Sequence, residues 1–64
     1  MKFPDVRVKL TDHDGNAWAI MGRVRAAMRK AGVAAESIDE YIREAMAGDY
    51  DNLLRVTMET VEVE

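Results

Sequence analysis

The sequence contains no cysteine, one histidine (His13) and one proline (Pro4). These absences exclude a disulfide framework and a thiolate metal site. The longest uninterrupted apolar run, 17–21, is far too short to cross a bilayer, and the N-terminus lacks the apolar segment of a secretion signal. We therefore expect a cytoplasmic protein with no membrane segment and no cofactor.

The sequence is also short, and a single domain over residues 1–64 buries only about 60% of the surface that its unfolded chain exposes. Its stability must come from close helix packing or from self-association. The net charge of −3 is unevenly distributed. Residues 1–32 carry seven basic and three acidic residues, whereas residues 33–64 carry two basic and nine acidic ones. Such asymmetry can steer a charged partner or bring two copies together.

Apolar periodicity predicts five elements. Alternation of Val6, Val8 and Leu10 with polar residues predicts a strand over 5–11. Helical spacing of apolar residues predicts helices over 17–31, 34–47 and 50–60, with Met46 and Met58 among the inward-facing side chains. A short strand is predicted over 61–63. Since two short strands are unstable alone, we expect an α+β domain of β-α-α-α-β order, with three helices packed on a two-stranded sheet formed by the first and last strands.

Several residues predict where the helices begin and end. Asp14 or Asn16 can cap the first helix, and Gly32 can supply the left-handed residue that ends it. Gly48 is expected to end the second helix, and Asp49 to cap the third.

The segment Asp12-His13-Asp14-Gly15-Asn16 is rich in oxygen ligands but fits no calcium loop. With Gly15 at the sixth position of an EF-hand loop, the first and twelfth positions would be Leu10 and Met21, which cannot bind calcium. His13 has no second histidine or cysteine to complete a transition-metal site. We interpret the segment as a strand-to-helix turn.

No group of residues predicts catalysis. Glu36, Glu40 and Glu44 share one helix face at i, i+4 spacing, which is typical of a solvated surface. Ser37 is the only serine, and nothing in the sequence brings it to His13. We therefore expect that the protein is not an enzyme.

One flank of the first helix is the candidate contact surface. Trp18, Gly22, Arg25 and Arg29 fall within about 60° of one another beside the apolar stripe. The indole of Trp18 can fold over the edge of the core while the arginines stay in water. Alternatively, the four residues form a contact patch, because Trp and Arg are frequent interface hot spots and Gly22 permits close approach.

Two binding functions follow from this surface. The leading hypothesis is a non-enzymatic protein-interaction module that binds an unidentified protein partner and can self-associate. The alternative is a nucleic-acid-associated protein that adds four further cations to Arg25 and Arg29, namely Arg7, Lys9, Arg23 and Lys30. Nucleic acid is the weaker expectation, because at a pI near 5.0 the non-specific attraction to phosphates is small.

Short strings over nearly the whole chain resemble one family. They are Pro4-Asp5-Val6-Arg7-Val8 with Leu10-Thr11, Asp14-Gly15-Asn16-Ala17, Ile20-x-x-Arg23-Val24, Ala31-Gly32-Val33 and Gly48-Asp49-Tyr50-Asp51-Asn52-Leu53-Leu54. The pattern resembles small uncharacterised bacterial and phage-borne proteins, and none of these strings carries a known reaction. Two positions depart from it: Ala34-Ala35 stands where a Ser or Thr cap is expected, and Thr60 where an aromatic residue is usual. The resemblance implies a phage or mobile-element accessory protein that works by binding.

Overall fold

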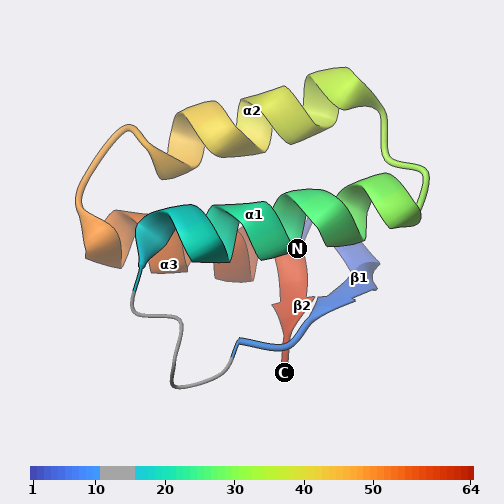
Figure 1. The fold of residues 1–64 in the computed structure, drawn as a ribbon, viewed down its shortest axis with the longest axis horizontal. Coiled ribbons are helices and arrows are strands. Elements are labelled where there is room, and N and C mark those ends of the chain that lie inside the picture. The colour runs from blue at the N-terminus through green and yellow to red at the C-terminus, as the bar shows by residue number, and fades with distance from the viewer. Residues whose placement is uncertain (11–15) are drawn as a thin grey trace.

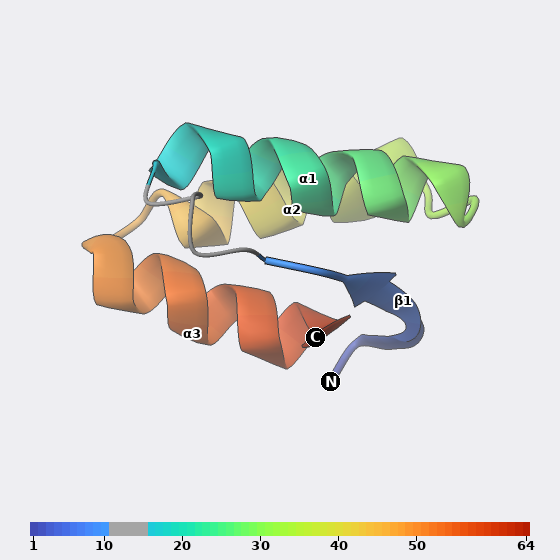
Figure 2. The same cartoon turned by 60° about the horizontal axis from the view of Figure 1, so that its bottom comes forward.

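The computed structural model describes residues 1–10 and 16–64 (Figure 1). Along the chain these residues form β1 (Phe3–Val8), α1 (Ala17–Lys30), α2 (Ala35–Ala45), α3 (Tyr50–Thr60) and β2 (Val61–Val63). The predicted β-α-α-α-β order of an α+β fold is confirmed. The three helices run side by side along the long axis of the molecule, each packed on the other two, and the small sheet contacts α1 and α3 (Figures 1 and 2).

The sheet consists of β1 and β2, which pair in parallel. Phe3 is opposite Val61 and Val8 is opposite Val63, with an irregular register between Phe3 and Arg7. Pro4 lies in this irregular stretch and has no backbone N–H to donate to a ladder. Two backbone bonds flank the ladder: the N–H of Lys2 donates to the Glu59 carbonyl (3.0 Å), and that of Glu64 to the Val8 carbonyl (2.9 Å).

The predicted bounds of the first strand, 5–11, are wrong. The strand begins at Phe3 and ends at Val8, because its short partner β2 ends at Val63, opposite Val8. Leu10 lies beyond the strand and is only partly buried against the core. Residue 11 is outside the described residues.

Three of the predicted helix ends are confirmed. The Asn16 side chain accepts a hydrogen bond from the Trp18 backbone N–H at 2.9 Å and so caps α1; Asp14, the other candidate, lies outside the described residues. Gly32 follows α1 with φ at +83°, in the left-handed region that favours glycine. The Asp49 side chain accepts a bond from the Asn52 N–H at 2.9 Å and caps α3. At the start of α2, Ala34 provides no side-chain cap.

The prediction that Gly48 ends the second helix is wrong. Helix α2 ends at Ala45 rather than at residue 47, and Gly48 does not adopt a positive φ. The last carbonyls of α2 are instead bound by Asn52, whose Nδ2 donates to the Glu44 oxygen at 2.9 Å and to the Ala45 oxygen at 3.5 Å. A Cβ at Gly48 would lie 2.8 Å from the Asn52 Cβ, so Gly48 provides the space for this cap.

The core lies where the helices meet the inner face of the sheet. Its buried apolar residues come from all five elements: Val6, Val8, Ile20, Met21, Val24, Met28, Ile38, Tyr41, Ala45, Leu53, Val56 and Val61. Met46 and Met58 were predicted to face inward but are 53% and 57% exposed. Thr57 and Thr60 are buried on α3 instead, because their hydroxyls bond to the Tyr41 hydroxyl and the Val56 carbonyl, both at 2.7 Å.

Candidate functional site

Helices α1 and α2 form one side of the molecule, which we call the α1–α2 face. They run antiparallel, joined by the short connection 31–34 (Figure 1). On α1 the face is formed by the four predicted residues Trp18, Gly22, Arg25 and Arg29. On α2 it is formed by Ala35, Asp39 and Ile42, together with Met46, which directly follows the helix. All eight are exposed except Ile42, which is half-buried.

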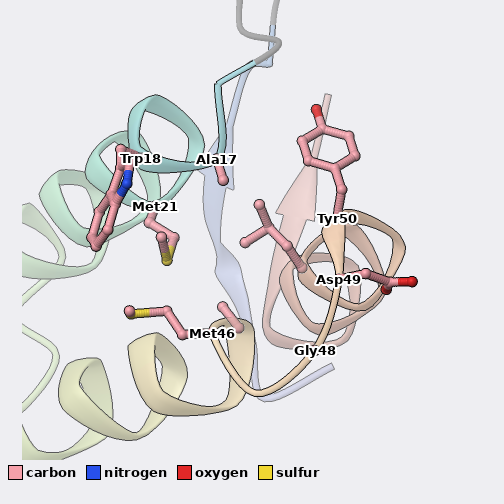
Figure 3. Close-up of a pocket in the computed structure, with 9 residues that line it drawn as sticks. Ala17, Trp18, Met21, Met46, Gly48, Asp49 and Tyr50 are labelled. Atoms are coloured by element: carbon pink, nitrogen blue, oxygen red, sulfur yellow. The ribbon is translucent and has the colours of Figure 1, made fainter.

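One end of the face is aromatic and apolar (Figure 3). A hollow of about 250 Å³ opens there between the start of α1, the end of α2 and the start of α3. Met21 and Met46 extend toward one another into it, and the Trp18 ring lies along its margin, whereas the Asp49 carboxylate is turned away (Figure 3). The indole of Trp18 is 66% exposed, so it does not fold over the edge of the core.

The middle of the face has little side-chain volume on α1. A second hollow of about 250 Å³ lies between Gly22, Arg25 and Ile42 and shares Trp18 and Met21 with the first. A Cβ added at Gly22 would meet no atom within 4 Å, so this part of the face is open to an approaching surface.

The other end of the face is basic. Arg25, Arg29, Ala35 and Asp39 line a third hollow of about 170 Å³, which shares Arg25 with the second. The three hollows are therefore neighbours in a row from Trp18 to Arg29, about 16 Å along α1, and we call this row the groove. Across the groove, Trp18 shares a hollow with Met46, Gly22 with Ile42, Arg25 with Asp39, and Arg29 with Ala35.

The cations of the nucleic-acid hypothesis do not gather on this face. Arg7 forms an ion pair with Glu64 at 3.8 Å, on the sheet. Arg23 lies about 160° around α1 from Arg25, on the opposite flank, and Lys30 is on the same side as Arg23. Lys9 directly follows β1 and is exposed. The structure thus brings together Trp18, Gly22, Arg25 and Arg29, and places Arg7, Arg23 and Lys30 away from them.

Among residues 1–10 and 16–64, two titratable groups have shifted pKa values, and neither lines the three hollows. Burial raises the pKa of Tyr41, partly opposed by its hydrogen bond with Thr57. A hydrogen bond with Glu40 raises the pKa of Lys2.

Over 1–10 and 16–64, no helix has the length and apolar character needed to cross a membrane. Over the same residues, no three His, Cys, Asp or Glu side chains are grouped to hold a metal ion. Residues 12–15 of the predicted turn 12–16, His13 among them, lie outside the described residues.

Sequence reasoning found the α1 half of the face and missed the α2 half. Ala35, Asp39, Ile42 and Met46 follow helical spacing on one flank of α2, but Ile42 and Met46 were assigned to the core because they are apolar. Their position could have indicated the face, because Ile42 and Met46 lie at the margin of the apolar stripe of α2, as Trp18 lies at the margin of the stripe of α1.

Comparison with known proteins adds no family. The chain matches no protein-family model, and no curated protein or solved structure is significantly similar to it. The resemblance to small bacterial and phage-borne proteins therefore stays a prediction.

Proposed function

We propose that this chain is a non-enzymatic protein-interaction module that binds its partner through the α1–α2 face. The observation that carries the proposal is the exposure of Trp18 and Met46 beside one another at the end of the groove. Large exposed apolar side chains grouped around a hollow are typical of interaction sites, whereas isolated ones are ordinary surface. A cytoplasmic, phage or mobile-element setting is part of the proposal and rests on the sequence alone.

The chemistry of the face supports binding over catalysis. Its floor is apolar, formed by Met21 and Ile42, and its charged groups stand at one end. Trp and Arg are the residues most enriched among interface hot spots, and both are present here without burial in the chain's own core.

The experiment that tests the proposal compares binding by the wild-type chain and by the double variant Trp18→Ala, Arg25→Glu. Both side chains are exposed, so the variant should keep its fold, checked by circular dichroism. We expect the variant to lose the partners and the self-association of the wild type. The matched control is Lys30→Glu, which reverses a charge on α1 outside the face. Identical partners and identical solution mass for wild type and double variant would refute the proposal.

A further inference from the structure

We infer that the partner on the α1–α2 face is a second copy of this chain, bound with two-fold symmetry so that α1 lies antiparallel on α1 and α2 on α2. The inference rests on the proposed function and specifies its occupant. In a two-fold dimer the same patch meets itself, so the patch must be self-complementary in charge and in size.

The distribution of charge selects the antiparallel arrangement. The basic residues Arg25 and Arg29 are at one end of the groove, and the uncharged Trp18 is at the other. A two-fold axis lying in the interface and perpendicular to α1 places the basic end of each copy over the aromatic end of the other. An axis along the helices would instead lay α1 on α2 of the second copy, with all four arginines and the two Asp39 carboxylates at one end of the interface.

The antiparallel arrangement places Trp18 of one copy against Arg29 of the second copy. These residues are at equal distances from the midpoint of the face, which lies between Gly22 and Arg25. An arginine over an indole ring gains a cation–π attraction, which is stronger when the pair is shielded from water. The symmetry repeats this contact, so each dimer contains it twice.

Side-chain sizes are complementary in the same arrangement. The midpoint of the α2 residues lies between Asp39 and Ile42, level with the midpoint on α1, because Gly22 shares a hollow with Ile42 and Arg25 with Asp39. Met46 therefore meets the small Ala35 of the second copy. Arg25 meets Gly22 of the second copy, where the missing Cβ leaves open space. Large side chains thus face small ones in two of the four kinds of contact, Met46 with Ala35 and Arg25 with Gly22.

The size of the chain also favours this partner. Stable interfaces begin at about 1,200 Å² in total, or about 600 Å² per copy. That area is about a seventh of the 4342 Å² accessible surface of the chain. A 64-residue domain without cysteine has few other means of increasing its buried apolar area.

The first test is solution mass by sedimentation equilibrium, with Trp18 fluorescence read in the same samples. At about 100 µM protein, a dimer with a micromolar dissociation constant is the main species. We expect twice the chain mass, and a blue shift of Trp18 emission that follows dimer formation as concentration rises. A monomer at this concentration would overturn the inference. The proposed function would survive that result only if another protein bound the wild type and not the double variant.

Single substitutions test which face is used. Trp18→Ala and Arg29→Glu should each raise the dimer dissociation constant at least ~10-fold. Lys30→Glu removes a neighbouring cation from the same helix end without touching the face, and it should leave the constant unchanged. A dimer that resists both face substitutions uses another surface, which would overturn the inference.

A mixing experiment tests the antiparallel register. Neither Trp18→Ala nor Arg29→Ala can form the Trp18–Arg29 contact in its own homodimer. A heterodimer of the two variants regains one of the two contacts, because the intact Arg29 of one copy meets the intact Trp18 of the other. We expect the mixture to associate more tightly than either variant alone. Equal association of the mixture and the separate variants would overturn this register.

Discussion

The hydroxyl of Tyr41 on α2 lies 2.7 Å from the hydroxyl of Thr57 on α3, and both side chains are buried. This bond joins two helices, and the two side chains are 2% and 0% exposed. It explains how a threonine occupies a fully buried position of α3. Each hydroxyl satisfies the other, so no unpaired polar group is left in the apolar interior.

Tyr41→Phe should therefore destabilise the fold by about 1–2 kcal/mol, because it removes the bond and leaves the Thr57 hydroxyl without this partner. The measurement is the free energy of unfolding from urea titration. Tyr41→Phe combined with Thr57→Val removes both hydroxyls and should be less destabilised than the sum of the single changes. If the free-energy losses of the two single variants add up to that of the double variant, the bond contributes nothing to stability.

The raised pKa of Tyr41 predicts a loss of stability in alkaline solution. Burial disfavours the tyrosinate in the folded chain, whereas the unfolded chain ionises at the ordinary value near 10.0. The unfolded state then binds fewer protons than the folded state, so the free energy of unfolding falls as pH rises above about 10. The fall should be smaller in Tyr41→Phe, when unfolding is measured from pH 8 to about 11. Parallel curves for the two proteins would contradict the prediction.

Gly48 and Gly22 should respond in opposite ways to alanine. Gly48→Ala places a Cβ 2.8 Å from the Asn52 Cβ, which forces Asn52 off the last carbonyls of α2 and should destabilise the chain by about 1–3 kcal/mol. Gly22→Ala meets no atom and raises helix propensity inside α1, so it should stabilise the chain by about 0.5–1 kcal/mol. Both values come from urea unfolding at low protein concentration. If Gly48→Ala and Gly22→Ala had the same free energy of unfolding, the contact at residue 48 would be relieved without breaking the bonds from Asn52 to α2.

The dispersed cations predict weak binding to nucleic acid. Arg7 is paired with Glu64, and Arg23 and Lys30 lie on the flank of α1 opposite Arg25, so they form no single positive surface with it. We expect no retention of the chain on a double-stranded DNA matrix at about 0.15 M salt. Retention that disappears in Arg25→Glu, Arg29→Glu would instead support the nucleic-acid hypothesis.

Local signals in the sequence predicted most of the fold. Helical spacing located all three helices, and the short-range caps at Asn16 and Asp49 were visible because the capping residue adjoins the amide it binds. The left-handed position of Gly32 was likewise a property of one residue. Side-chain contacts between different helices could not be predicted from the sequence. The role of Gly48 depends on the Asn52 side chain reaching back to α2, and the burial of Thr57 depends on Tyr41.

The candidate site was likewise predicted only in part, because it combines residues of two helices. The flank of Trp18, Gly22, Arg25 and Arg29 follows from the geometry of one helix, so the sequence was sufficient for it. The α2 half requires knowing that the two helices pack antiparallel with Trp18 level with Met46. Hydrophobicity alone assigned Met46 to the core, although it lies just beyond the end of α2 and is exposed.

The pairing of β1 with β2 has a consequence for the order of folding. The two strands are the first and last elements that the described residues form, so their pairing closes a loop over nearly all of residues 1–64. The helices form from contacts that are close in the sequence, whereas the sheet forms only when residues 61–63 reach β1. We therefore expect the sheet to form late in folding, with Val6 and Val8 lacking a strand partner until then.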